Sequence, residues 1–249
     1  MLDKFKQRSH RLEHIDTGNY TAEEYEGCIN ELRFVNRWLG DAHSLKATVL
    51  HEVETEHLTS FSILDLGAGS GELLRVAATW ARETNRQFKG VGLELNERMA
   101  ESILEESKRF DEITSVRGDA LRLPFAEAQF DYVICSLFTH HLLDDQVVQV
   151  LREMSRVAKR RLFVIDLHRH PVPYFLYTTV LKLVLHNRLV RHDGALSILR
   201  GFKSDELLEL AQRAGLPDVR VEHHFPSRLV LSAAAAVSHN KAQNAQIAA

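Results

Sequence analysis

The residues best suited to chemistry lie in one short stretch of the chain. Asp65 stands within the apolar run Ile63–Leu66, directly before Gly67, Gly69 and Gly71. Glycines in such a turn let a bulky ligand approach the backbone and permit angles that a β-carbon would forbid. A carboxylate two residues before the first glycine would repel a pyrophosphate, so this turn favours a ligand that carries a positive charge.

A second carboxylate narrows the class of ligand that the sequence predicts. A dinucleotide-binding loop of the form G-x-G-x-x-G would need glycine where Glu72 stands. A second apolar run, Phe88–Leu95, reaches Glu94 at its end, where a carboxylate can accept hydrogen bonds from both hydroxyls of a ribose. Adenosine with a positive charge indicates S-adenosylmethionine, and an NAD-dependent reductase is disfavoured.

Three further segments extend the pattern and identify a family. Ile63–Leu74 resembles the first motif of the class I S-adenosylmethionine-dependent methyltransferases. Val116–Phe125 is similar to the G-D-A-x-x-L-P-F turn of that family, Phe130–Ser136 to its fourth strand, and Leu137–Leu142 to the segment that follows. Four motifs in the right order are far more specific than a glycine loop alone. The resemblance implies the family's fold, cofactor and reaction type.

The resemblance and the residue types together predict a set of cofactor-binding residues. Asp65 would hold the ammonium group, Glu94 the ribose and Asp119 the adenine amino group. The alternatives are a helix cap for Asp65, a solvated strand end for Glu94 and a self-contained turn for Asp119. The full predicted set is Asp65, Gly67, Ala68, Gly69, Gly71, Glu94, Leu95, Gly118, Asp119, Ala120, Cys135, Ser136 and Leu137.

Two histidines are the candidates for catalysis. Methyl transfer to a phenol gains from a base, and histidine suits that task near neutral pH. His140 follows the fourth predicted strand and is the first candidate, although in the resembling family this position commonly lines the cofactor pocket. His168 follows the fifth strand and is the second. The neighbouring pair His192 and Asp193 is expected in a solvated loop, because adjacent side chains seldom point the same way.

The elements that must position these residues alternate along the chain. Strands are predicted near 62–66, 88–95, 113–118, 130–136 and 160–166, and helices near 71–84, 97–109, 144–157 and 204–215. Two last strands are expected near 218–225 and 227–233. This order predicts an α/β fold, Rossmann-like and doubly wound, with a mostly parallel seven-stranded sheet and an antiparallel last strand.

The parts outside this alternation define the predicted domains. Residues 1–58 are expected to be an N-terminal helical segment, with Thr21 and Glu24 as a capping box before an apolar stripe from Tyr25 to Leu39, and a second helix from Ala42. These helices could cover the cofactor or acceptor mouth, or pack on the sheet. Residues 59–235 form the cofactor-binding domain, and 236–249 a flexible tail.

An insertion at about 168–200 interrupts the domain after the fifth strand. Its stretch 173–185 is strongly apolar but too short to span a bilayer. It is interpreted first as a lid over an apolar acceptor site, with a plain core helix and a membrane contact as alternatives. The insertion is similar to those of bacterial small-molecule methyltransferases encoded near polyketide synthases, which implies a phenolic or polyketide-derived acceptor.

Composition sets the remaining bounds. A net charge of −3 and the lack of a basic, aromatic-rich run disfavour nucleic acid as a partner. Cys28 and Cys135 cannot form a disulfide framework and lie in no metal-ligand spacing, so no metal is expected. The polar start of the chain shows no secretory signal, which predicts a cytoplasmic location.

The resulting prediction is a methyltransferase that uses S-adenosylmethionine on an apolar, aromatic small molecule, with oxygen of a phenol as the expected acceptor atom. Carbon methylation of a quinol or resorcinol ring is the alternative within this class. A cofactor-binding partner protein without catalysis is the alternative from another class. Stable membrane insertion is not expected, and an oligomer is compatible with the sequence.

Overall fold

The computed structural model describes residues 3–18, 20–21, 23–24, 27–28, 31, 40–181 and 185–236. A seven-stranded sheet with the order β3-β2-β1-β4-β5-β7-β6 forms its centre. The strands are β1 (Ser60–Leu66), β2 (Gln87–Glu94), β3 (Ile113–Arg117), β4 (Phe130–Ser136), β5 (Ala158–Leu167), β6 (Arg220–His224) and β7 (Arg228–Ala234). Only β7 runs antiparallel to its neighbours, so the predicted fold class is confirmed.

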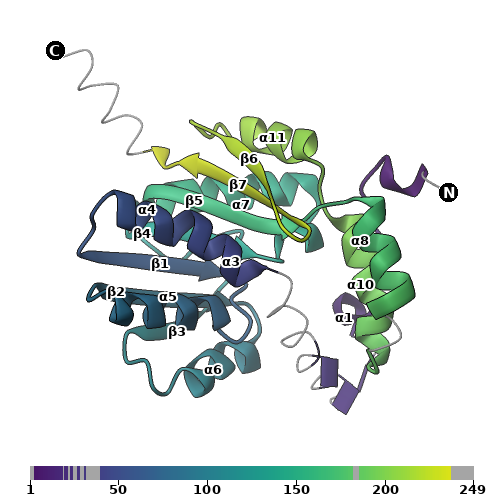
Figure 1. The fold of residues 1–249 in the computed structure, drawn as a ribbon, viewed down its shortest axis with the longest axis horizontal. Helices are drawn as coiled ribbons and strands as arrows, with labels where there is room; N and C mark the ends of the chain where they lie inside the picture. Colours follow the sequence, from purple (N-terminus) through teal and green to yellow (C-terminus); the bar gives the residue numbers. More distant parts are fainter. Residues whose placement is uncertain are drawn as a thin grey trace.

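Helices cover both faces of the sheet (Figure 1). Those of the alternating part are α5 (Glu72–Glu83), α6 (Glu97–Glu106), α7 (Asp144–Val157) and α11 (Ser204–Arg213). Alternate residues of each central strand serve opposite faces. Leu64 and Leu66 of β1 belong to the core that α7 and α11 complete, whereas Ile63 belongs to the core on the α5 side. Because both faces are buried, the strands read as continuous apolar runs in the sequence.

The N-terminal segment divides into two parts that pack in different places. The helical stretch formed by α3 (Asp41–Leu45), the π-helical turn η2 (Lys46–Leu50) and α4 (His51–Thr55) buries Leu45, Val49 and Val53 against the sheet core. The earlier part, which includes η1 (Asp3–Phe5) and α1 (His14–Thr17), lies instead against the insertion. Packing on the sheet is therefore found for the stretch from α3 to α4, whereas a cover over the cofactor or acceptor mouth stays a prediction.

The described residues of the insertion form three helical pieces rather than one apolar helix. These are α8 (Pro171–Leu176), the π-helical turn η4 (Tyr177–Leu181) and α10 (Arg188–Arg200). They share a small apolar cluster with the N-terminal part, centred on Cys28, Tyr177 and Leu189. In Figure 1 α8, α10 and α1 stand together beyond one end of the sheet. Among the described residues, no helix is long and apolar enough to cross a membrane.

Some predictions fall on residues that the structure does not describe. Most of the apolar stripe from Tyr25 to Leu39 and the tail beyond residue 236 lie outside the described residues. The capping box before that stripe is confirmed, because Thr21 N donates to Glu24 Oε2 at 3.0 Å and Glu24 N donates to Thr21 Oγ1 at 3.2 Å.

Candidate functional site

The glycine loop lies at the point where the strand order reverses. It leaves β1, which has β2 on one side and β4 on the other. In open α/β sheets the crevice at such a point, at the carboxyl ends of the strands, is the usual ligand site. Gly67, Gly69 and Gly71 have φ angles of 64°, 57° and 77°, in the left-handed region. The loop therefore turns with its backbone open to a ligand, as the glycine spacing predicts.

Asp65 is a buried carboxylate with an unused oxygen. The residue is only 2% exposed, and among the described residues its Oδ1 has no hydrogen-bond partner. Burial raises the pKa of Asp65 well above its ordinary value, and the neighbouring Glu94 charge raises it further. A buried carboxylate without a partner is costly. The site is thus prepared for a cation that would favour the ionised form.

Glu94 lies at the end of β2, on the neighbouring strand. Its Oε1 accepts a hydrogen bond from Gly69 N at 2.6 Å, so the carboxylate is tied to the glycine loop. Burial raises the pKa of Glu94, while the hydrogen bonds from Gly69 and Leu95 lower it in part. The same side chain lines an open depression together with Leu95 and Asn96. It is not a solvated strand end.

These features fit S-adenosylmethionine, whose parts include an ammonium group, a sulfonium and a ribose diol. The unpartnered oxygen of Asp65 suits the cationic end, and the second oxygen of Glu94 suits the ribose hydroxyls. A pyrophosphate would meet two carboxylates here instead of free backbone donors. The two carboxylates distinguish this loop from a dinucleotide site.

Asp119 has a local role in the structure. Its Oδ1 accepts a hydrogen bond from Leu121 N at 2.8 Å, which fixes its own turn, and the side chain is exposed. Gly118 N donates to Glu94 O at 2.9 Å, so this turn is joined to the end of β2. Ala120 is buried in the core on the α7 side. Asp119 therefore fixes its own turn, which was the alternative prediction. The second carboxylate oxygen of Asp119 stays available for an adenine amino group.

The end of β4 borders the glycine loop on the side opposite to β2. Cys135 is fully buried and its Sγ lies 4.0 Å from Met154 Sδ, so its side chain faces the core and only its backbone borders the site. Ser136 Oγ is buried without a partner among the described residues. Leu137 has a φ of 50°, an unusual conformation for a residue with a side chain. Such strain is concentrated at functional sites.

His140 is held by a carboxylate that the sequence analysis did not single out. Its Nδ1 lies 2.7 Å from Asp166 Oδ1, and Asp166 Oδ2 accepts from His140 N and Thr139 Oγ1 at 3.0 and 2.5 Å. All three residues are buried. Burial would raise the pKa of Asp166, but the His140 charge and these hydrogen bonds together hold it below its ordinary value. The signal for Asp166 was a lone acid ending the apolar run of the fifth strand.

His168 has different surroundings. Its ring stacks on His170 at 5.2 Å and meets His223 edge-on at 4.6 Å. Burial and the charges of His223, His170 and Arg169 lower its pKa to about 4. A histidine with this pKa is a weak base at neutral pH. No described contact joins His168 to His140, so the structure does not bring the two candidates together.

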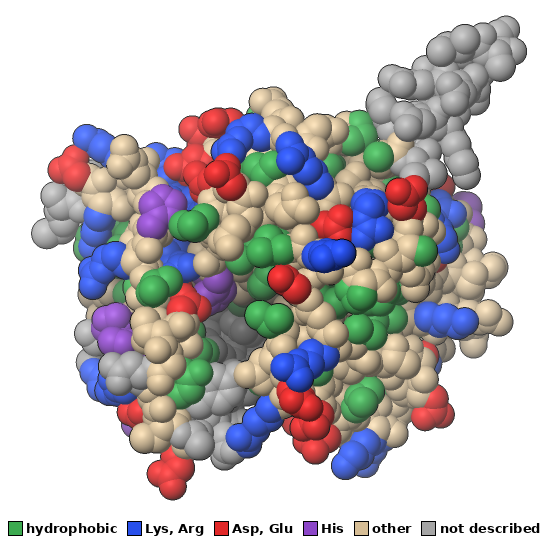
Figure 2. All heavy atoms as spheres, turned by 180° about the vertical axis from the view of Figure 1, so that it is seen from behind, with side chains coloured by type: hydrophobic (Ala, Val, Ile, Leu, Met, Phe, Trp, Pro, Cys, Tyr) green, Lys and Arg blue, Asp and Glu red, His purple; other side chains and the backbone are tan. Residues whose placement is uncertain are grey.

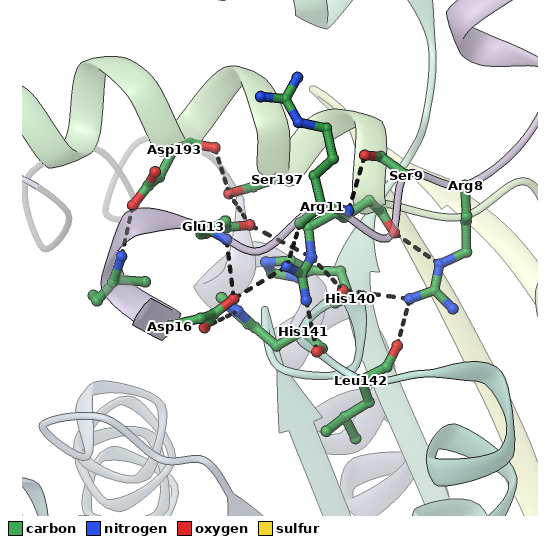
Figure 3. Close-up of polar contacts among 12 residues, drawn as sticks. Arg8, Ser9, Arg11, Glu13, Asp16, His140, His141, Leu142, Asp193 and Ser197 are labelled. Atoms are coloured by element: carbon green, nitrogen blue, oxygen red, sulfur yellow. Dashed lines mark hydrogen bonds and ion pairs between the residues drawn. The ribbon is translucent and has the colours of Figure 1, made fainter. Parts of the chain in front are cut away.

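The N-terminal part closes over His140 and His141 (Figure 3). His141 Nδ1 lies 3.1 Å from Asp16 Oδ1, and Arg8 Nη2 donates to Leu142 O at 2.8 Å. Asp193 of α10 accepts from His14 N and Ile15 N at 2.9 and 3.1 Å. The contacts join three segments that are far apart in the sequence.

The expectation of a solvated loop at His192 and Asp193 is wrong. Both residues lie in the helix α10, and Asp193 is buried because its oxygens accept the backbone donors of the N-terminal part. His192 Nδ1 lies 2.9 Å from Asp193 Oδ1, so adjacent residues do pair here. Figure 2 shows a hollow in the surface of the face opposite to that of Figure 1, with a histidine side chain at its margin.

The chain is similar in sequence to known methyltransferases. Residues 63–161 match the family described as "Methyltransferase domain". The chain is 29% identical over 113 residues to the demethylmenaquinone methyltransferase of Staphylococcus haemolyticus, which is 44% of this chain and 46% of that protein. It is 29% identical over 175 residues to the 2-phytyl-1,4-naphtoquinone methyltransferase of Thermosynechococcus vestitus, 66% of this chain and 74% of that protein.

A solved structure supports the same fold. Human N-acetylserotonin methyltransferase in complex with S-adenosylmethionine superposes with a TM-score of 0.62 at 16% identity, covering 91% of this chain and 63% of that one. The chain spans less than half the length of the Staphylococcus relative. Residues 63–161 therefore match a methyltransferase domain, as the four motifs predict, and the solved structure supports the predicted fold.

Proposed function

We propose that this chain, which carries a class I S-adenosylmethionine-dependent methyltransferase domain, transfers a methyl group to an apolar small molecule. The observation that carries the proposal is a pair of carboxylates on adjoining strand ends around an open glycine loop, the buried Asp65 and the half-buried Glu94. The matched domain at residues 63–161 supports it. S-adenosylmethionine, when bound, supplies a methyl group on a positively charged sulfur, which is already activated for displacement.

The chain's own residues mainly align the reactants and exclude water, and alignment alone can supply several kcal/mol. We assign the activation of the acceptor to His140. Asp166 holds Nδ1 of its imidazole at 2.7 Å, which leaves Nε2 to take the proton of an acceptor hydroxyl. Asp166 is then a positioning residue, because it acts through His140. The insertion and the N-terminal part would cover the acceptor.

The oxygen of a phenolic or polyketide-derived acceptor is the proposed methylation site. A second candidate is methylation of a ring carbon of a quinol. Two of the relatives support it, because they are named as methyltransferases of demethylmenaquinone and of a phytyl-naphthoquinone. Removal of the phenolic proton by His140 would activate the oxygen and the adjacent ring carbon alike. The His140–Asp166 pair is therefore compatible with both products.

Calorimetry tests the cofactor. We expect the protein to bind S-adenosylhomocysteine and to show no heat with NAD, and Glu94→Ala should weaken the binding without unfolding the protein. Asp131→Asn, at the amino end of β4, is the matched control and should bind normally. Binding of NAD, or unchanged affinity in Glu94→Ala, would contradict the assignment.

Mass spectrometry with a labelled donor tests the reaction. A panel of alkylated phenols, resorcinols and reduced naphthoquinones is incubated with S-adenosylmethionine that carries a heavy methyl group. An aryl methyl ether would support oxygen methylation, and a ring C-methyl product would support the second candidate. His140→Ala should lower turnover more than donor affinity, whereas a loss confined to His168→Ala would move the role to that residue. Tight binding without any product would favour a non-catalytic partner protein.

A further inference from the structure

We infer that Glu13, His140 and His141 form a binding site for a divalent transition-metal ion. Each of the three side chains offers one ligand atom, and these atoms lie within 4.8 Å of one another. Ligand atoms on one such ion lie about 3 to 3.5 Å apart. The side chains would therefore have to close by about 1.5 Å or less, which small rotations about their bonds can provide.

The carboxylates behind the two imidazoles are the second observation. His140 Nδ1 lies 2.7 Å from Asp166 Oδ1. His141 Nδ1 lies 3.1 Å from Asp16 Oδ1 (Figure 3). Histidines that bind metals almost always give their other ring nitrogen to such a partner, which fixes the ring and raises its basicity. Both rings are therefore anchored through Nδ1 and have Nε2 to offer.

Glu13 completes the set from the N-terminal part of the chain. Glu13 and His140 are each only 3% exposed, which is unusual for an acid unless it has partners. Ser197 Oγ donates to Glu13 Oε1 at 2.9 Å, so the carboxylate is oriented by α10. Two imidazoles and a carboxylate leave coordination positions open on an ion.

Charged groups surround the cluster. Arg200 faces Glu13, with Nε 3.8 Å from Oε1, and Asp16, with Nη1 3.1 Å from Oδ2. On the other side Arg8 pairs with Asp144 at 2.6 Å. With Asp166, these described groups comprise four carboxylates and two guanidinium groups, so two positive charges are still needed for balance. Uncompensated buried charge is costly, and either one divalent cation or two protonated imidazoles would supply these charges.

The donor set indicates the kind of ion. Imidazole suits zinc, iron, nickel and copper, whereas magnesium and calcium prefer sites built from oxygen alone. The sequence shows no metal-ligand spacing because Glu13 is separated from the histidine pair by most of the domain. The inference rests on the proposed methyl transfer and changes one step of it. With the ion bound, His140 Nε2 would be a ligand and not the base, and the ion would lower the pKa of the acceptor hydroxyl in its place.

Calorimetry on the full-length protein, stripped with a chelator and free of donor, tests the site with Zn²⁺ as the probe. We expect one ion per chain, and Co²⁺ should give the absorption bands of a nitrogen- and oxygen-ligated ion. His141→Ala and Glu13→Gln should each weaken binding at least about tenfold, and Asp16→Asn about tenfold, as for partners behind a ligand. Binding of S-adenosylhomocysteine by each variant shows that it is folded and separates this test from that of the proposed function.

His192→Ala is the matched control. His192 also pairs with a carboxylate, and with His14 and Asp193 it forms a second group of possible ligands. The oxygens of Asp193 already accept His14 N and Ile15 N, so we expect this variant to bind Zn²⁺ like the wild type. The inference is overturned if the stripped protein binds no ion saturably, if binding survives in both His141→Ala and Glu13→Gln, or if it is lost in His192→Ala. Any of these results would make the cluster a buried ion-pair network balanced by protonated imidazoles.

Discussion

At the scale of single residues, the protein keeps two partly desolvated carboxylates on adjoining strand ends, the buried Asp65 and the half-buried Glu94. Asp65 has an oxygen without a partner, and Glu94 is tied to the glycine loop on the next strand. Such an arrangement costs stability in the free protein, because desolvation disfavours the ionised form. It makes sense for a site whose ligand is positively charged, since binding then restores the charge balance.

The Asp65→Asn variant tests whether the site binds a positively charged ligand, because such binding should change the protonation of Asp65. Because the pKa of Asp65 is raised, the folded protein holds a proton that the unfolded chain releases, so stability falls as pH rises from the ordinary carboxyl pKa through the raised value. A cationic ligand favours the ionised form, so binding of S-adenosylmethionine should release a proton. Calorimetry in buffers of different ionisation enthalpy measures this release. Asp65→Asn should abolish it, weaken binding and make the free protein more stable at pH 8.

Asp166→Asn tests the positioning of His140. The variant should lower turnover at least about tenfold, because the imidazole loses the partner that fixes its orientation, while donor affinity changes little. The pKa of Asp166 is lowered, so its contribution to stability is present at neutral pH and is lost as pH falls toward the lowered value. Denaturant unfolding should therefore show a difference from the wild type that is constant from about pH 7 to about pH 4 and shrinks below the ordinary carboxyl pKa of 3.8. A pH-independent difference would argue against the ionised pair.

At the scale of elements, the strand ends and the loops that follow them build the site. The β1 loop, the end of β2 and the strained Leu137 after β4 meet at one edge of the sheet. None of these loops is long, so each position is fixed by the hydrogen bonds of its strand. This is why small changes in a loop should affect binding more than folding.

Gly69→Ala and Gly215→Ala form a matched pair for that claim. Both glycines have positive φ angles, 57° and 75°, and a β-carbon at either would meet no atom within 4 Å. The left-handed conformation should cost each variant about 1–2 kcal/mol in the free energy of unfolding. Only Gly69→Ala should weaken S-adenosylhomocysteine binding in calorimetry, because its β-carbon enters the space beside the loop. Equal affinity in the two variants would remove Gly69 from the site.

At the scale of the whole molecule, the described residues pack around two separate regions, the sheet and the insertion. The sheet has its own cores on both faces, while the insertion and the first residues of the chain share a smaller one. The buried Asp193 joins these first residues to α10 through two backbone donors. The cover over His140 therefore depends on contacts between segments that are about 180 residues apart.

Asp193→Ala should loosen this cover without disturbing the sheet. We expect faster hydrogen exchange and proteolysis within residues 8–17, lower turnover and unchanged binding of S-adenosylhomocysteine. Glu24→Ala is the control, because the Glu24–Arg188 pair joins the same parts at the exposed surface and should contribute little. Equal exchange in the two variants would mean that Asp193 does not hold the N-terminal part.

The sequence by itself determined the sheet and the cofactor loop. Strand limits, the three glycines and the acids at positions 65 and 94 are local signals, because burial on both faces produces apolar runs and a tight turn requires glycine. For the same reason the capping box at Thr21 could be predicted, whereas the local turn of Asp119 was only one of two alternatives.

Only the tertiary structure decided what surrounds His140. Asp166 comes from the next strand, and Glu13 and Asp16 come from the start of the chain, so no spacing in the sequence indicates that they meet. The helix at Asp193 was missed for a related reason: its buried acid is stabilised by backbone donors far away in the chain. Periodicity reports the neighbours of a residue along its own element, and long-range polar contacts leave no such pattern.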